Sequence, residues 1–147
     1  MSSVTLAQAA TIVDAALQKG RDTSCAPLTV AVLDSGGHLV CFKREDKSGI
    51  LRFDIAYGKA WGALGFGFGS RELSNRAAKQ QMFYTAIAAA SGGRVVPAPG
   101  GVLVRNVAGE VIGCVGISGD VSDKDEACAV AGIEAAGLTA DTGTAPT

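Results

Sequence analysis

Charged side chains that could bind a small anion and act on it are spread through the middle and the end of the sequence. Lys59 stands in a largely apolar segment, and Glu126 follows a Gly-Ile-Ser-Gly turn by a few residues. A lysine can stabilise enolate-like charge, and a glutamate in a pocket can move a proton. Arg44 and Arg71 could each hold a carboxylate in two-point fashion. These four residues predict an acid–base enzyme of the hydrolase, lyase or isomerase type that acts on an unsaturated or keto dicarboxylate.

The same residues also have ordinary structural roles. A charged side chain on an apolar face is rarely buried alone, so Lys59 could form an ion pair or extend its ammonium group to solvent. Glu126 could pair with Lys59 or with Arg44. Asp123 and Asp125 lie in the first turn of an expected helix, where carboxylates suit the positive helix end. If Lys59 instead belongs to an anion pocket, we expect Lys59→Met to keep the fold and to lose affinity for a carboxylate ligand.

The Ser118-Gly119 turn is a second candidate for anion binding. It lies between a strand pattern and a helix start, where free backbone N–H groups suit a carboxylate or a phosphate. The Gly-x-x-x-x-Gly-Lys-Ser/Thr pattern of a nucleotide-binding P-loop is absent from the sequence. The alternative is a tight strand-to-helix turn that needs glycine for its geometry alone.

His38 is the only histidine, and it lies beside a Ser-Gly-Gly turn where its imidazole should be exposed. An exposed imidazole could ligate haem iron from an open face, or it could be a hairpin residue without a ligand. No metal site is expected, because the four cysteines form no Cys-x-x-Cys pair and the acidic residues lack EF-hand spacing. Cys41 and Cys114 lie in apolar strand patterns, which favours buried thiols.

Hydrophobic periodicity predicts the elements that must position these residues. A helix should begin at Thr5, which has capping-box spacing with Gln8, and Gly20 could close it. The other expected elements are strands at 28–33 and 39–43, helices at 54–64, 71–78 (capped by Ser70) and 80–90, a short strand at 95–96, strands at 102–104 and 111–117, and a last helix capped by Ser122. Two hairpins without parallel crossovers predict an α+β domain with helices packed on an antiparallel sheet. The domain should span residues 1–137, followed by a disordered tail at 138–147.

Composition narrows the possible partners. A net charge of −1 and the lack of a basic run argue against nucleic acid, and no apolar stretch is long enough to span a membrane. The N-terminal residues lack the pattern of a signal peptide, so a cytoplasmic protein is expected. Hydrophobic residues make up 48% of this short chain, and such a surplus of apolar surface predicts a homo-oligomer.

A series of short motifs runs in order along nearly the whole chain. It comprises Asp34 at a strand end, Gly36-Gly37, Arg44 with Asp46, Lys59-Ala60, Gly100-Gly101, Gly116-x-Ser118-Gly119 and Asp125-Glu126. Each motif is weak alone, but together, from about Thr5 to Gly137, they resemble the GlcG/HbpS family, which includes the C-terminal domain of PduO-type proteins. The resemblance implies a profilin-like or PAS-like fold with about five antiparallel strands, and it implies homo-oligomers.

The resemblance leaves the function open, because fold does not determine it. Some members bind haem or respond to it, and others lie beside genes for the breakdown of small organic acids or aromatic compounds. We expect a protein that binds a small anionic molecule in such catabolism and requires no cofactor, with Gly101 joining Ser118 and Gly119 at the ligand. The first alternative is a haem-binding or haem-responsive protein, in which His38 would be the iron ligand. The second is a non-catalytic oligomeric accessory protein.

Overall fold

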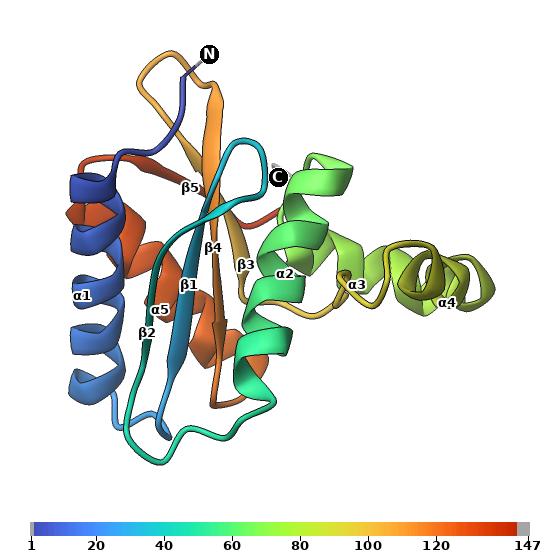
Figure 1. The fold of residues 1–147 in the computed structure, drawn as a ribbon, viewed down its shortest axis with the longest axis horizontal. Helices are drawn as coiled ribbons and strands as arrows, with labels where there is room; N and C mark the ends of the chain where they lie inside the picture. Colours follow the sequence, from blue (N-terminus) through green and yellow to red (C-terminus); the bar gives the residue numbers. More distant parts are fainter. Residues whose placement is uncertain (1, 144–147) are drawn as a thin grey trace.

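The computed structural model describes residues 2–143, which form one sheet with helices on both of its faces (Figure 1). The helices are α1 (Leu6–Asp22), α2 (Arg52–Phe66), α3 (Ser70–Lys79), α4 (Gln81–Ala90) and α5 (Ser122–Ala135). The strands are β1 (Thr29–Asp34), β2 (Leu39–Arg44), β3 (Gly101–Arg105), β4 (Val111–Ser118) and β5 (Thr139–Asp141). α1 and α5 cover one face of the sheet, and α2 covers the other. The predicted α+β class with an antiparallel sheet is confirmed.

The strand order is β2-β1-β4-β3-β5, and every neighbouring pair is antiparallel. The central strands β1, β4 and β3 are almost completely buried, which explains their nearly continuous apolar sequences. β2 lies at one edge and exposes Leu39 and Phe42. Both predicted hairpins, β1–β2 and β3–β4, are therefore confirmed, and the pairing of β1 with β4 joins them.

β5 corrects the predicted tail. Thr139–Asp141 pairs with β3, so that Arg105 lies opposite Thr139. Arg105 Nε donates to Asp141 Oδ2 at 2.9 Å, and the two side chains form an ion pair in which Nη2 also lies 2.9 Å from Oδ2. The sequence predicted that the domain ends at residue 137 and that the chain is disordered from residue 138. For β5 this prediction is wrong, because backbone pairing and an ion pair stabilise a segment of small polar residues. Residues 144–147 of the predicted tail lie outside the described residues.

α1 begins as predicted but ends later. Thr5 Oγ1 accepts a hydrogen bond from Gln8 N at 3.1 Å, and Thr5 N donates to Gln8 Oε1 at 2.9 Å, which confirms the capping box. Gly20 lies inside the helix rather than at its end, and its missing side chain leaves room for Leu28. On the same side of the sheet, the missing Cβ of Gly132 lets α5 approach the α1 backbone closely. The two helices thus seal the larger part of the core.

α2 packs on the opposite face through its backbone. Gly101 of β3 and Gly116 of β4 lie opposite each other in the sheet. A Cβ on Gly116 would overlap the carbonyl oxygen of Ala56, and a Cβ on Gly101 would overlap that of Lys59. We call Gly101 and Gly116 the glycine platform. This platform brings α2 directly onto the sheet and thereby determines where Lys59 lies.

Two serines that were predicted to cap helices have other positions. Ser70 is the first residue of α3, and its hydroxyl donates to Ala98 O at 2.6 Å and accepts from Gly101 N at 2.7 Å. Ser122 is the first residue of α5, and the cap of that helix makes no side-chain hydrogen bond. Ser70 therefore links α3 to the start of β3 instead of satisfying its own helix end.

The segment after α2 leaves the layered body, and α4 projects sideways from it (Figure 1). α3 and α4 occur where the sequence predicted helices. The expected strand at 95–96 does not form. Instead, Val96 and Val95 lie against Gly58 and Gly62 of α2, whose missing side chains leave the space that these valines occupy.

Candidate functional site

Lys59 lies in the middle of α2 and is only 3% exposed. Its Nζ donates to Ile117 O at 2.9 Å and to Asp125 Oδ2 at 3.2 Å. Asp125 is also buried, and its Oδ1 accepts a hydrogen bond from Asp120 N at 3.0 Å. Burial lowers the pKa of Lys59 and raises the pKa of Asp125, although each charge stabilises the other. Lys59 therefore has its partner inside the protein, and that partner is Asp125 rather than Glu126.

Glu126 forms an ion pair of its own. Arg71 Nε donates to both carboxylate oxygens, at 3.1 and 2.9 Å, and Arg71 Nη2 also donates to Asp123. These hydrogen bonds raise the pKa of Arg71 above its ordinary value. The structure thus does not form the predicted site in which Lys59 and Glu126 act together beside a free Arg71. The ion pairs instead tie α2 and α3 to the first turn of α5.

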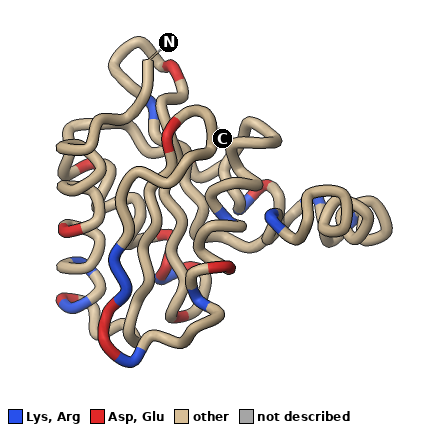
Figure 2. The backbone as a smooth tube through the Cα atoms, viewed as in Figure 1, with Lys and Arg blue, Asp and Glu red and all other residues tan. Residues whose placement is uncertain are grey.

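Arg44 stays apart from these ion pairs. It ends β2 in the same rung of the sheet as Thr29 of β1 and Ser118 of β4. Its side chain is exposed and lines a shallow surface cavity of about 410 Å³, next to a loop in which the acidic pair Glu45-Asp46 is followed by Lys47 (Figure 2). Within residues 2–143 Arg44 makes neither a side-chain hydrogen bond nor an ion pair. The expected convergence of Arg44 with Lys59 and Glu126 is therefore absent from this part of the chain.

The turn after β4 is filled by the protein's own groups. Ser118 is buried, and its Oγ accepts a hydrogen bond from Arg52 Nη1 at 3.1 Å. A Cβ on Gly119 would overlap the carbonyl oxygen of Pro27, so the group that approaches this glycine closely is neighbouring backbone. Gly101, the third residue expected at a ligand, lies under the α2 backbone. All three residues contact other parts of the fold, and for Ser118 and Gly119 this agrees with a tight strand-to-helix turn.

The β1–β2 turn carries an oriented and exposed imidazole. Asp34 Oδ1 accepts from Gly36 N and His38 N, both at 2.9 Å, and lies 3.2 Å from His38 Nδ1. Partial burial raises the pKa of Asp34, but the two backbone hydrogen bonds and the interactions with the His38 side chain together lower it below its ordinary value. The ionised carboxylate can only accept, so Nδ1 carries the hydrogen and Nε2 remains free for a ligand. The His38 side chain is 80% exposed, as predicted.

An apolar groove lies between α2 and α4. It encloses about 280 Å³ and is lined by Trp61 and Phe66 of α2, Ile87 of α4 and Val95 of the loop that follows α4. We call it the Trp61 groove. Trp61 also lines a smaller hollow of about 160 Å³ under the β1–β2 turn that bears His38. The groove and the hollow thus share one aromatic wall.

Arg94 adds a cation to this wall. Its guanidinium carbon lies 4.1 Å from the centre of the Trp61 ring, and its Nε donates to Ser91 O at 2.7 Å. The sequence predicted no role for Trp61 or Arg94, because they meet only where the loop after α4 returns to α2. The one signal was the single tryptophan of the chain, which lies two residues after Lys59.

Residues 2–143 offer neither a metal-binding cluster nor a helix that could cross a membrane. Among these residues, no three His, Cys, Asp or Glu side chains come close enough together to hold a metal ion. Likewise, none of the helices that the structure describes combines the length and the apolar character needed to cross a membrane. The four cysteines are free thiols, and Cys114 is buried as predicted. The prediction is wrong for Cys41, which is only half-buried because β2 is an edge strand.

The sequence matches a family model described as "Haem degrading protein HbpS-like" over residues 4–134. Among solved structures, the chain is similar to PduOC in complex with haem, with 24% identity over 92% of this chain and 96% of that chain and a TM-score of 0.83. Protein ORFY of Klebsiella pneumoniae shows 25% identity over 93% and 92% of the two chains, again with a TM-score of 0.83. A double mutant of HbpS from Streptomyces reticuli shows 26% identity over 91% and 87%, with a TM-score of 0.77. No curated protein sequence gives a match.

Proposed function

The chain belongs to the HbpS-like family, and from that premise we propose that it binds haem in the Trp61 groove. The observation that carries the proposal is an apolar groove with Arg94 on its aromatic wall and an oriented His38 on the turn beside it. Bound haem would supply iron-centred redox chemistry, whereas the protein supplies the walls, a cation and an imidazole.

The walls and the cation suit the chemistry of a porphyrin. Such a ligand is flat and apolar except for two carboxylates, so its site needs apolar surfaces with a few placed polar groups. Trp61 and Phe66 offer aromatic surface. Within residues 2–143, Nε is the only Arg94 nitrogen with a hydrogen bond, so both Nη groups remain available to hold a carboxylate in two-point fashion.

His38 is suited to hold the iron. A carboxylate behind a metal-binding imidazole orients the ring and increases the basicity of the ligating nitrogen. Asp34 has this position behind Nδ1, which directs Nε2 away from the turn. The imidazole also lies against Gly36, which lines the hollow that shares Trp61 with the groove.

Haem titration of His38→Ala tests the iron ligand. Loss of a coordination bond is expected to weaken apparent affinity by about tenfold or more and to change the position of the Soret band. Arg94→Gln is expected to weaken binding while leaving the Soret band where it is, because it removes a carboxylate contact and not the ligand. Both effects are read by absorbance while hemin is added to protein purified without haem.

The chain offers a matched control for the arginine. Arg76 lies over the Phe68 ring, with its guanidinium carbon 4.4 Å from the ring centre, but it lies outside the Trp61 groove. Arg76→Gln should therefore titrate like the unmodified protein. Titration curves for His38→Ala and Arg94→Gln that both coincide with those of the unmodified protein and of Arg76→Gln would contradict this site.

The acid–base enzyme on a small carboxylate has less structural support. Its proposed groups Lys59, Glu126 and Arg71 are already neutralised by contacts within the fold. Arg44 is the exposed cation that could still attract an anion. Calorimetry with a dicarboxylate on the unmodified protein and on Arg44→Gln decides this alternative. The acid–base enzyme requires that the unmodified protein binds the dicarboxylate and that Arg44→Gln does not.

We also propose that the protein forms a homo-oligomer through α4. This helix projects from the body, and it exposes 88% of Met82 and 51% of Phe83. Exposed apolar side chains of this size on one projecting element are typical of an interface.

Light scattering is expected to give a mass at least twice the 14.8 kDa of one chain. The double substitution Met82→Glu and Phe83→Glu should lower that mass toward one chain, because both new side chains would carry charge into the interface. Val107→Glu is the control, since Val107 is fully exposed in the β3–β4 turn. A single-chain mass for the unmodified protein at every concentration would refute the oligomer.

A further inference from the structure

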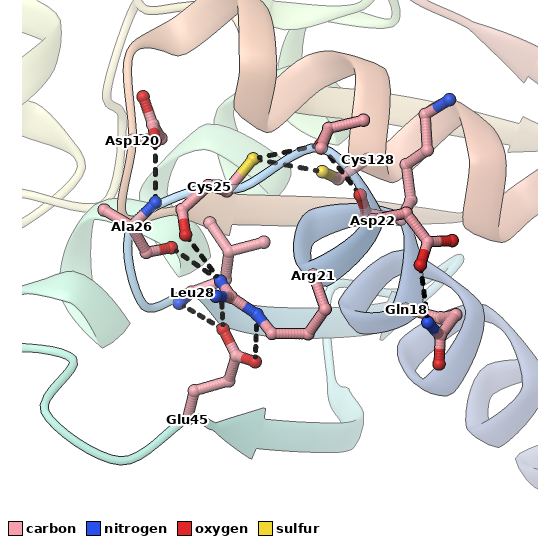
Figure 3. Close-up of polar contacts among 11 residues, drawn as sticks. Gln18, Arg21, Asp22, Cys25, Ala26, Leu28, Glu45, Asp120 and Cys128 are labelled. Carbon is pink, nitrogen blue, oxygen red and sulfur yellow. Dashed lines mark hydrogen bonds and ion pairs between the residues drawn. The ribbon is translucent and has the colours of Figure 1, made fainter.

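Two thiols from distant parts of the chain lie in contact behind the sheet. Cys25 Sγ and Cys128 Sγ are 3.9 Å apart although 103 positions separate them in the sequence. Cys25 lies in the loop between α1 and β1, and Cys128 lies on α5 (Figure 3). Cys25 is 4% exposed and Cys128 is 1% exposed. The two sulfur atoms therefore face each other inside the core between α1 and α5.

Hydrogen bonds hold the Cys25 loop in this position. Arg21 Nη2 donates to Cys25 O at 2.8 Å and to Ala26 O at 3.0 Å, and its Nε pairs with Glu45 at 3.0 Å (Figure 3). From the other side, Ala26 N donates to Asp120 Oδ2 at 2.7 Å. The loop is thus tied to α1, to the residue after β2 and to the segment before α5. These restraints hold the Cys25 sulfur against the Cys128 sulfur.

We propose that Cys25 and Cys128 are a redox site, at which a hydroperoxide converts the two thiols into an intramolecular disulfide. The sulfur of one deprotonated cysteine attacks the terminal peroxide oxygen, the O–O bond breaks, and a sulfenic acid and an alcohol or water form. The sulfur of the second cysteine then attacks the first sulfur and loses its proton, and the S–O bond breaks to release water. Two thiols are oxidised by two electrons, and the hydroperoxide is reduced.

The surroundings indicate which cysteine reacts first. Burial, together with the neighbouring Cys25 sulfur, raises the pKa of Cys128 to about 12, so Cys128 is almost entirely a thiol near neutral pH. Cys25 is the more exposed of the two cysteines, and its chain neighbours Ser24 and Ala26 are exposed. We therefore assign the attack on the peroxide to Cys25 and the second step to Cys128.

The geometry requires only a small movement. A disulfide has a sulfur–sulfur distance of about 2.05 Å, so the atoms must approach from their present contact distance by side-chain rotation and a shift of the loop. The other two cysteines differ in this respect. Cys114 Sγ donates to the carbonyl oxygen of Val115, at 3.7 Å, and Cys41 lies on the edge strand β2. Neither sulfur has another sulfur as a hydrogen-bonding neighbour among residues 2–143.

Thiol counting after treatment with hydrogen peroxide tests the proposal. The treated protein is denatured, alkylated with N-ethylmaleimide and weighed by mass spectrometry. Two of the four thiols are expected to escape alkylation, dithiothreitol is expected to restore both, and the peptide map should join Cys25 to Cys128. Before reduction, the oxidised protein should also melt several degrees higher, because the new bond closes a long loop of the chain.

Cys128→Ser and Cys25→Ala are expected to abolish the linkage, and Cys41→Ser is the control that should keep it. Even if a variant at Cys25 or Cys128 fails to fold, the peptide map of the oxidised unmodified protein shows whether these two cysteines are linked. Four alkylated thiols after peroxide treatment would overturn the proposal. So would a linkage through Cys41 or Cys114, or a sulfinic acid on Cys25 without any linkage. None of these outcomes bears on haem binding, because the thiols and the Trp61 groove lie on opposite faces of the sheet.

Discussion

Gly116→Ala is expected to lower the free energy of unfolding by about 3 kcal/mol or more, although it adds only one methyl group. The new Cβ would overlap the carbonyl oxygen of Ala56 in α2, and neither backbone can move easily. Gly116 lies in a central strand that pairs with β1 and β3, and α2 rests on it across the glycine platform. Since a domain of this kind has a total stability of about 5–15 kcal/mol, the effect will be plain in urea unfolding followed by circular dichroism.

Gly65→Ala provides the matched control. Gly65 lies in α2 itself, it is exposed, and apart from the neighbouring helix backbone no atom lies within 4 Å of the position where its Cβ would be. Alanine is a better helix former than glycine, so this variant should be more stable by up to about 1 kcal/mol. If Gly116→Ala lost no more stability than Gly65→Ala, α2 could not be resting on the glycine platform as the structure describes.

Lys59→Met is expected to destabilise the protein by about 3–5 kcal/mol, because it leaves the buried carboxylate of Asp125 without its cation. From the sequence we expect the variant to keep the fold if Lys59 belongs to an anion pocket, and the buried ion pair changes that expectation. Methionine does preserve the apolar stem of Lys59, but the loss lies in the uncompensated charge on its partner and in the freed carbonyl oxygen of Ile117. Chemical denaturation near neutral pH measures it.

The pH dependence of that loss identifies its cause. Burial already raises the pKa of Asp125, and without Lys59 the opposing attraction disappears. The folded variant then binds a proton at Asp125 more tightly than the unfolded chain does. Its deficit against the unmodified protein is therefore smallest below the ordinary carboxyl pKa of about 3.9 and grows as pH rises through the raised pKa. A second substitution, Asp125→Asn, should recover much of the stability and flatten this dependence.

Lys43→Met separates this effect from a general cost of removing a lysine. Lys43 Nζ also lies beside a carboxylate, at 2.7 Å from Asp14, but both side chains are more than half exposed. Water screens such a pair, so little change is expected from the same substitution. Equal losses in Lys43→Met and Lys59→Met would contradict the importance of burial at Lys59.

Local pattern was enough to predict most elements of the fold. The capping box at Thr5 and the apolar spacing that follows it depend only on residues within a few helical turns, and they predicted the start of α1 correctly. β5 was missed because its three residues have no strand pattern of their own. They pair with β3 because Arg105 lies within reach of Asp141 after the chain has returned from α5.

The arrangement of the candidate site could not be predicted, because it depends on how α5 is rotated about its axis and on contacts between distant segments. Asp125 and Glu126 are adjacent, and about 100° of helix rotation decides which of them faces Lys59. The polar run at the start of α5 carries no apolar stripe from which that rotation could be read. Trp61 and Arg94 belong to segments that meet only in the folded protein, so no spacing in the sequence could predict their contact.

The pairing of β1 with β4 has a consequence for how the chain reaches its fold. Thr29 lies opposite Ser118, so this central contact encloses all of α2, α3 and α4 in one large loop. Contacts between such distant residues form slowly, because the chain must lose much of its freedom before they are made. During synthesis, β1 and β2 leave the ribosome long before β4 exists, and the apolar β1 then has a free edge. A nascent chain that has not yet reached Val111 should therefore depend on chaperones to stay out of aggregates.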